Sequence, residues 1–439
     1  MTTDNGSTEL GLERLTENLQ RVEALTQRLL AAVSHKKAVR PALQGPGHDL
    51  FTKAATAYVT EMMSNPSRMI EQQIAYWGQS LQHFVDSQSA PADRRFSDPM
   101  WNEHPYFNFI RQQYLLNTKA METAVAQMDN LDTRERQKLD FFSRQIMDMF
   151  SPSNFLGTNP QALARAVETD GESLVRGLEN LVRDIEANNG DLMVTLADQG
   201  AFDVGSNIAT TPGKVVFRNH LFELIQYSPT TQTVQEVPLV IFPPWINKFY
   251  IMDLRPENSL VKWIVEQGFT LFVVSWINPD ASMRDTGVDT YIEDGFIAAI
   301  EQVKKFCDVP QVNATGYCIG GTTLSLTLAL LAQRGDTSVK SATLFTTLTD
   351  FSDQGEMSVF LDDDFVDGIA AEVEENGILD KFFMSRTFSF LRSNDLIYGP
   401  AIRHYMMGET PPAFDLLYWN GDGTNLPGRM AIEYLRGLC

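Results

Sequence analysis

Cysteine is scarce in this sequence, which has only Cys307, Cys318 and Cys439 among its 439 residues. Three cysteines cannot form a disulfide framework, and none of them belongs to a CxxC pair of the kind that binds zinc. We therefore expect no metal site. Because disulfides are typical of oxidising compartments, their absence favours a reducing, cytoplasmic location.

Basic residues are outnumbered, with 35 Lys and Arg against 56 Asp and Glu and a formal charge of −21. This balance argues against nucleic-acid binding, which needs a basic surface. No apolar run approaches the ~18 residues of a transmembrane helix. Residues 1–4 (MTTD) are polar, so we expect no signal peptide. The hydrophobic content of 43% is enough for a packed core, and we expect a folded chain.

Helical periodicity dominates the first 200 residues. An amphipathic stripe comes first, and its apolar residues recur at three- and four-residue steps: Leu12, Leu15, Leu19, Val22, Leu25 and Leu29. Such a helix packs on its own domain, which we favour, or attaches to a partner or an apolar surface. Further helices are predicted over residues 109–128, 134–149 and 161–187. We predict a helical N-terminal domain over residues 1–200.

The pattern changes near residue 214 to short apolar strands that alternate with helices. The predicted strands are residues 215–217, 221–227, 238–242, 270–275, 311–315 and 341–346. Helices are predicted over residues 259–266 and 291–306. Fully apolar strands that alternate with helices are typical of a parallel sheet covered on both faces. We predict an α/β domain over residues 201–439.

The stretch Gly316-Tyr317-Cys318-Ile319-Gly320-Gly321 lies between a predicted strand and a predicted helix. Gly-x-Cys-x-Gly in this context is a nucleophile elbow with cysteine in place of serine. The turn strains the nucleophile's backbone, so Gly316 and Gly320 must leave room for it. Gly321 lets the helix approach the sheet closely. The alternative is a buried cysteine in an ordinary strand–turn–helix, but the surrounding α/β pattern favours catalysis.

The elbow predicts catalytic roles for the N-terminus of the following helix and for the N–H of Ile319. The N-terminus of the following helix directs amide groups at the Cys318 sulfur, and we expect this to lower the thiol pKa. The N–H of Ile319 is predicted to be one donor of the oxyanion hole, which stabilises negative charge on the substrate oxygen.

Residues 350–400 are expected to form a lid inserted between strands of the sheet. They contain the acidic run 362–364 and then several phenylalanines. A charge run of this kind is more often a solvated face than a metal site, so we assign no metal to it.

Seven short sequence motifs carry a family resemblance. They are residues 94–99 (RRFSDP), 243–254 (PPWINKFYIMDL), 274–280 (VSWINPD), 316–321 (GYCIGG), 394–396 (NDL), 414–420 (FDLLYWN) and 425–427 (NLP). Together they resemble class I polyhydroxyalkanoate synthases, the polymerases that make poly(3-hydroxybutyrate), over the chain from about residue 50 onward.

The resemblance implies an α/β-hydrolase fold with a lid insertion behind the helical N-terminal domain. It also implies transfer of 3-hydroxyacyl groups from 3-hydroxyacyl-CoA onto a growing polyester through an acyl-cysteine. The CoA thioester is a substrate, so no cofactor is expected. A cytoplasmic homodimer at the polyester granule surface is implied as well. Ile246 follows an apolar strand, where the second oxyanion donor is predicted. Asp253 matches a family aspartate whose role is at least as readily structural.

Two catalytic groups are missing from the pattern. An α/β-hydrolase places its Asp or Glu and then its His after the nucleophile, and His404 is the only histidine after Cys318. The resemblance puts the catalytic Asp and His on later strands, so we predict that neither is present in this chain and assign His404 a non-catalytic role. We accordingly expect a chain truncated at its C-terminus, without the last strands of its sheet, inactive alone and prone to aggregation.

Two other functions stay open. A cysteine-dependent hydrolase, such as a thioesterase or a polyester depolymerase, would use the same elbow and release a free acid. A non-catalytic granule-associated protein would keep the fold without the full set of catalytic groups. The intact elbow argues against the second of these.

Overall fold

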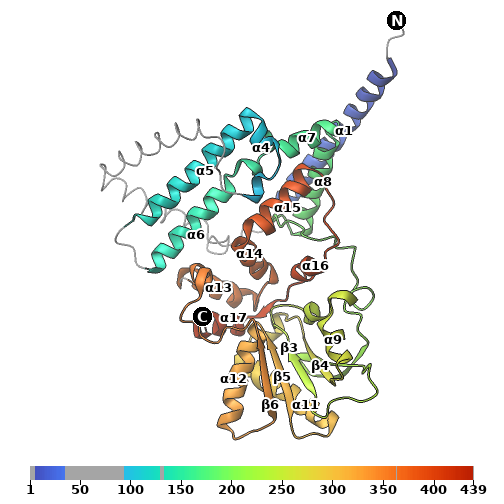
Figure 1. Ribbon diagram of the computed structural model, residues 1–439, viewed down its shortest axis with the longest axis vertical. Helices are drawn as coiled ribbons and strands as arrows, with labels where there is room; N and C mark the ends of the chain where they lie inside the picture. Colours follow the sequence, from blue (N-terminus) through green and yellow to red (C-terminus); the bar gives the residue numbers. More distant parts are fainter. Residues whose placement is uncertain (1–4, 35–92, 129–132, 362, 439) are drawn as a thin grey trace. The chain divides into compact units, whose positions relative to one another are not determined.

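The computed structural model describes residues 5–34, 93–128, 133–361 and 363–438. The chain divides into two compact units, which can be followed in Figure 1. The first, called the helical unit, comprises Met1–Leu196 and Phe388–Pro411. The second, called the sheet unit, comprises Ala197–Thr387 and Pro412–Cys439.

Within the described residues, the N-terminal part of the helical unit contains six α-helices. They are α1 (Asn5–Ser34), α4 (Met100–Glu103), α5 (Pro105–Ala126), α6 (Thr133–Met149), α7 (Pro160–Glu168) and α8 (Glu172–Ala187). Helix α1 packs on α8, where Leu25 is buried against Val175 and Val182. Because the apolar stripe of α1 contacts α8, the structure agrees with the expectation that α1 packs on its own unit. The side chains of Leu12 and Leu15 lie outside the described residues.

The helical range predicted over residues 161–187 is confirmed as two helices, α7 and α8. The chain breaks between them because Asp170 and Gly171 have left-handed backbone angles, with φ of 51° and 81°. The N–H of Gly171 donates to Ala166 O at 2.8 Å, which closes the C-terminus of α7.

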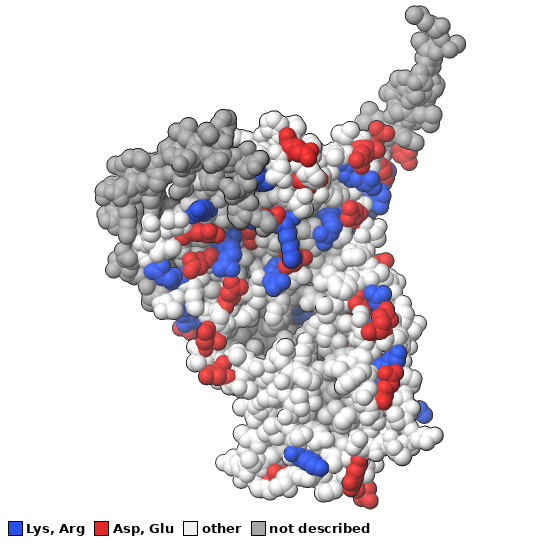
Figure 2. All heavy atoms as spheres, viewed as in Figure 1, with Lys and Arg blue, Asp and Glu red and all other residues white. Residues whose placement is uncertain are grey.

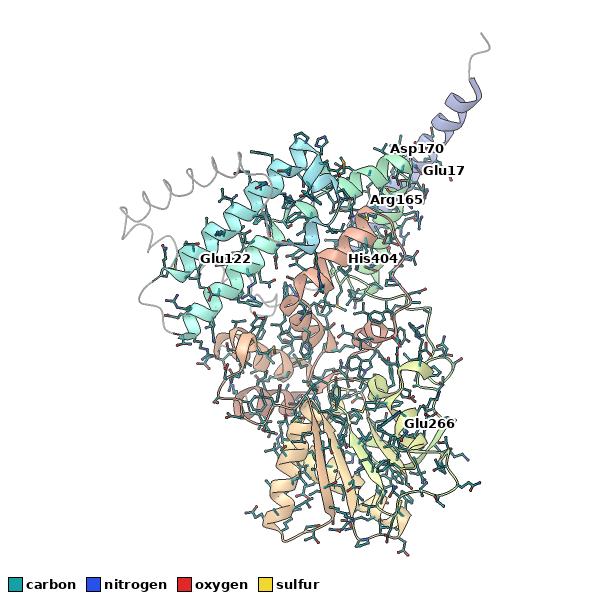
Figure 3. All side chains as sticks on the ribbon, in the orientation of Figure 1. Glu17, Glu122, Arg165, Asp170, Glu266 and His404 are labelled. Carbon is teal, nitrogen blue, oxygen red and sulfur yellow. The ribbon has the colours of Figure 1, made fainter. Side chains whose placement is uncertain are left out.

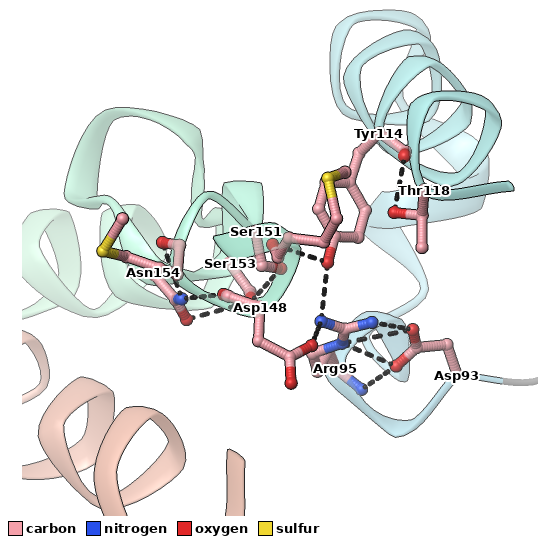
Figure 4. Close-up of polar contacts among 10 residues, drawn as sticks. Asp93, Arg95, Tyr114, Thr118, Asp148, Ser151, Ser153 and Asn154 are labelled. Atoms are coloured by element: carbon pink, nitrogen blue, oxygen red, sulfur yellow. Dashed lines mark hydrogen bonds and ion pairs between the residues drawn. The ribbon is translucent and has the colours of Figure 1, made fainter. Parts of the chain in front are cut away.

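Arg95, in the first of the seven sequence motifs (residues 94–99), is the centre of a polar network inside the helical unit (Figure 4). Its guanidinium donates to Asp93 at 2.7 Å, to Asp148 at 2.8 Å and to the Tyr114 hydroxyl at 2.7 Å. The neighbouring Phe96 ring is buried against Trp101 in an edge-on contact with centroids 4.8 Å apart. The motif at residues 94–99 therefore has a structural role.

The sheet unit is built on six strands in the order β1-β2-β4-β3-β5-β6. They are β1 (Gly213–Arg218), β2 (Phe222–Tyr227), β3 (Leu239–Phe242), β4 (Leu271–Trp276), β5 (Val312–Tyr317) and β6 (Val339–Phe345). The pairs β1/β2 and β2/β4 are antiparallel, and the remaining pairs are parallel. All six strands fall where the sequence predicts them.

Helices cover both faces of the central strands. On one face, Ile241 and Val273 pack with Val261 of α9 (Leu260–Glu266). On the other, the ring of Phe242 stacks on Phe296 with centroids 4.2 Å apart. Phe296 belongs to a continuous helical stretch made of α10 (Val288–Thr290), a π-helical turn (Tyr291–Ile297) and α11 (Ala298–Cys307). Burial on both faces explains why β3 is apolar at every position and β4 at every position except Ser275.

Strand β6 lies at the end of the sheet and is exposed along most of its length. Leu344 and Phe345 are 42% and 40% exposed. Among the described residues β6 pairs only with β5, so its other backbone edge is available for pairing.

The segment expected to be a lid is divided between the two units. Its first part contains α13 (Asp363–Asn376) and the strand β7 (Ile378–Leu379), which pairs with β8 (Leu426–Pro427). The boundary between the units falls within α14 (Lys381–Leu391), after Thr387. Residues Phe388–Pro411 cluster with the helical unit instead, which differs from the division predicted from the sequence. On the face drawn in Figure 2, basic and acidic side chains are interspersed. Among the described residues, no helix is both long and apolar enough to cross a bilayer.

Candidate active site

Cys318 lies at the turn between β5 and α12 (Ile319–Gln333), at the carboxyl end of the parallel strands. Its backbone has φ 53° and ψ −127°, a strained conformation for a residue with a side chain. The N–H of Cys318 donates to Phe345 O at 2.9 Å, and its carbonyl accepts from the N–H of Gly321 at 2.8 Å. The turn is thus fixed to β6 on one side and to its own helix on the other.

Each glycine of the elbow occupies a place where a side chain does not fit. A Cβ on Gly316 would lie 2.4 Å from the Cα of Gly321, and a Cβ on Gly320 would lie 2.4 Å from Phe242 O. A Cβ on Gly321 would lie 2.0 Å from Oγ1 of Thr347. Without side chains at Gly316 and Gly320, the backbones of the strand and the helix come into direct contact. The spacing therefore follows from the geometry of the turn.

The expectation that the helix N-terminus lowers the Cys318 thiol pKa was wrong. Burial raises the pKa of the Cys318 thiol, and the hydrogen bond from the Ile319 N–H opposes that rise only in part. The thiol is therefore protonated at neutral pH, and a nucleophilic role requires a base. Burial and the nearby Cys318 thiol also raise the pKa of the adjacent Tyr317.

The loop after β3 contains Ile246 and lies against the first turn of α12. The indole Nε1 of Trp245 donates to Oγ1 of Thr323 at 3.1 Å, and Thr323 Oγ1 donates to Ile319 O at 3.0 Å. The carbonyl of Ile246 accepts from the N–H of Thr424 at 3.2 Å. Its own N–H has no acceptor among the described residues. The loop that contains this N–H is thus fastened to the elbow helix, and the role of Ile246 as the second oxyanion donor stays a prediction.

Asp253 has a structural environment. Its carboxylate is 1% exposed and accepts from Thr211 Oγ1 at 2.6 Å, from Ser259 Oγ at 2.5 Å and from the Thr211 N–H at 3.3 Å. These bonds hold residues 209–211 against the loop that follows β3. The structural alternative for Asp253 is the one that its contacts favour.

Sequence reasoning missed the part played by residues 412–427, which return from the helical unit and lie along the loops at the carboxyl ends of β3 and β4. Trp419 Nε1 donates to Lys248 O at 2.8 Å, and the Tyr250 hydroxyl donates to Asp422 at 2.8 Å. The Asn425 N–H donates to Asn278 Oδ1 at 2.9 Å. The aromatic and amide residues of the last two motifs (residues 414–420 and 425–427) could have indicated this role, because side chains of these types hold loops in place through hydrogen bonds from their polar ends.

The described histidines have partners away from Cys318. His104 caps α5, and exposed His220 pairs with Asp294. His404 belongs to the helical unit, where Figure 3 labels it, and it is 2% exposed with Nδ1 3.2 Å from Glu409 O. Burial lowers the pKa of His404. Within the described ranges no histidine hydrogen-bonds to Cys318, and the prediction that the catalytic Asp and His lie elsewhere stays a prediction.

Two family models match the chain. The one described as poly-beta-hydroxybutyrate polymerase (PhaC) N-terminus matches residues 92–264. The one described as alpha/beta hydrolase fold matches residues 237–434, which confirms the predicted fold class. A solved structure from work on fungal esterases of Rhizomucor miehei has a TM-score of 0.28 at 15% identity, over 49% of this chain and 62% of that chain. A likeness of this size adds nothing to the argument.

Longer bacterial proteins resemble the chain over most of its length. A poly(3-hydroxyalkanoate) polymerase of Methylorubrum extorquens is 40% identical over 430 residues, which are 92% of this chain and 71% of that protein. The PhaC subunit of Rhizobium meliloti is 41% identical over 85% of this chain and 63% of its own length. That of Cupriavidus necator is 42% identical over 82% and 62%. The chain thus spans between about three fifths and seven tenths of these relatives.

Proposed function

The chain belongs to the poly(3-hydroxyalkanoate) polymerase family, and on this premise we propose that Cys318 is the nucleophile that takes a 3-hydroxyacyl group from its CoA thioester. The observation that supports this most is the elbow itself. Cys318 is held at a positive φ by three glycines whose missing side chains leave room for the turn. Backbone strain of this kind persists where a reactive side chain has to be presented.

The proposed step exchanges one thioester for another. The Cys318 sulfur attacks the carbonyl carbon of the acyl-CoA, and the oxygen of the tetrahedral intermediate accepts from the N–H groups of Ile319 and Ile246. The bond to the CoA sulfur then breaks, CoA leaves as a thiol with the proton lost by Cys318, and an acyl-cysteine remains. The hydroxyl oxygen of another 3-hydroxyacyl group then attacks the acyl-cysteine carbonyl to form the ester, the bond to the Cys318 sulfur breaks, and the hydroxyl proton goes to that sulfur, which restores the thiol. This step needs no cofactor.

The raised thiol pKa makes a base necessary for rapid turnover. The resemblance assigns that role to a histidine oriented by an aspartate, and this assignment stays a prediction. Dimerisation, association with granules, a cytoplasmic location and inactivity of the chain alone likewise stay predictions.

The direct test is release of CoA from 3-hydroxybutyryl-CoA by the purified chain, with Cys318→Ala and Cys307→Ala as the matched pair. Because no described histidine bonds Cys318, the proposal expects, at about pH 9, release of roughly one CoA per chain without sustained turnover, which Cys318→Ala abolishes and Cys307→Ala leaves unchanged. Oligomeric ester as the product supports polymerisation, whereas free 3-hydroxybutyrate alone would favour a hydrolase. Equal release by both variants would contradict the assignment of Cys318. Granule binding by Cys318→Ala, with no release by the parent chain, would favour the non-catalytic alternative.

A further inference from the structure

Thr424 carries a buried hydroxyl without a partner. The residue is 1% exposed, and its Oγ1 has no hydrogen-bond partner among the described residues. Buried hydroxyls in folded proteins are nearly always paired, so an exception of this kind is a candidate contact for a bound ligand. The proposed mechanism does not use this group.

The backbone of Thr424 lies beside the candidate oxyanion loop. The Thr424 N–H donates to Ile246 O at 3.2 Å, and Gly423 pairs with Asn247 in an antiparallel bridge. Trp245, immediately before Ile246, is fastened through Thr323 to the first turn of the helix that begins after Cys318. Thr424 thus lies across the Ile246 loop, on the element that holds this loop in place.

We propose that the Thr424 hydroxyl hydrogen-bonds the 3-hydroxyl of the acyl group at Cys318 and thereby selects 3-hydroxyacyl over unsubstituted acyl thioesters. The acyl group has two polar positions, the carbonyl oxygen and the hydroxyl on the carbon two bonds away. The proposed mechanism assigns the carbonyl oxygen to Ile319 and Ile246. The 3-hydroxyl then needs a partner that donates or accepts, and a threonine hydroxyl does both.

Selectivity follows from the pairing. A substrate with the 3-hydroxyl satisfies Thr424, whereas an unsubstituted acyl group leaves the buried hydroxyl unpaired. Sites built to bind a substrate hydroxyl reject analogues that lack it for this reason. One neutral hydrogen bond corresponds to a preference of about three- to tenfold. The inference rests on the proposed function, since it presumes an acyl group at Cys318.

The test measures binding rather than turnover, in the full chain carrying Cys318→Ala, so that no chemistry interferes. Calorimetry compares 3-hydroxybutyryl-CoA with butyryl-CoA, which differ only in the 3-hydroxyl. We expect a Kd ratio of about three to ten with Thr424, close to one in Thr424→Val, and restored in Thr424→Ser. Thr387→Val removes another buried threonine hydroxyl, which bonds Phe383 O, and should leave the ratio unchanged.

The outcomes separate the two claims. A merely structural role of Thr424 would weaken both ligands alike and preserve their ratio, so an unchanged ratio in Thr424→Val overturns the inference while the proposed function stands. Binding of neither ester to Cys318→Ala contradicts the proposed function, and the inference fails with it. Should Thr424→Val not fold, as judged by circular dichroism, Thr424→Ala takes its place with the same expected ratio.

Discussion

Replacing Gly320 by alanine tests how the elbow is built. A Cβ at this position would lie 2.4 Å from Phe242 O and 2.8 Å from Pro243 O, whereas ordinary contacts begin at 3.4 Å. The carbonyl of Phe242 would have to move by 3.4 − 2.4 = 1.0 Å. Phe242 is opposite Gly316 in the parallel ladder of β3 and β5, so this movement disturbs the centre of the sheet.

The expected cost of Gly320→Ala follows from that geometry. Overpacking a well-packed interior typically costs 1–3 kcal/mol. Both obstructing atoms are backbone atoms, which cannot rotate away, so we expect about 3 kcal/mol, the upper end of that range. Urea unfolding followed by intrinsic fluorescence measures the change in the free energy of unfolding, and the rate of Cys318 alkylation reports whether the elbow has moved.

Gly437→Ala is the matched control, because no atom lies within 4 Å of the place its Cβ would take and its φ is not positive. We expect that substitution to change the free energy of unfolding by about 0.5 kcal/mol or less. If Gly320→Ala unfolds within about 1 kcal/mol of Gly437→Ala, with unchanged alkylation of Cys318, the steric account of the elbow is refuted.

Three further predictions concern charge and protonation. Because burial raises the Cys318 thiol pKa, alkylation of Cys318 by iodoacetamide, with the other two cysteines replaced by serine, should keep accelerating up to about pH 9; a plateau below pH 8 would contradict this. Because burial lowers the pKa of His404, the folded state favours its neutral form, so the stability it contributes is present above the unfolded pKa of about 6.5 and lost as pH falls below it. Urea unfolding across this range should therefore show a shallower loss for His404→Gln than for the parent chain, and equal slopes would count against it. Arg95→Met should lower the free energy of unfolding by about 3 kcal/mol, because it leaves Asp93 and Asp148 without their shared cation. Exposed Arg94→Met should change it by less than about 0.5 kcal/mol, and similar values for the two variants would refute the network's importance.

The features that the sequence predicted well depend on local pattern. Strands β3 and β4 are buried on both faces and are apolar at nearly every position, which made their type and order readable, whereas β5 contains Asn313 and Thr315 and was readable from the elbow that follows it. The elbow was readable because the steric demands of its turn restrict Gly316 and Gly320 to glycine. In each case the physical constraint acts on residues adjacent in the sequence.

The features that were missed depend on contacts between distant segments. The sequence does not show that residues 388–411 join the helical unit, where the Tyr405 hydroxyl donates to buried Asp184 at 2.5 Å across 221 positions. The Cys318 pKa was predicted in the wrong direction because burial outweighs the helix N-terminus, and burial depends on the packed fold. The unpartnered hydroxyl of Thr424 also becomes visible only once its surroundings are known.

The most direct test of the central claim is the mass of the Cys318 peptide after exposure to 3-hydroxybutyryl-CoA. At about pH 9 part of the thiol ionises without help from a base, so acylation should proceed even if turnover is slow. The account predicts one 3-hydroxybutyryl group on the peptide containing Cys318, absent after Cys318→Ala, and little on that containing Cys307. Equal labelling of Cys307 and Cys318, or no adduct on Cys318, would contradict the claim that this elbow presents an acyl-accepting nucleophile.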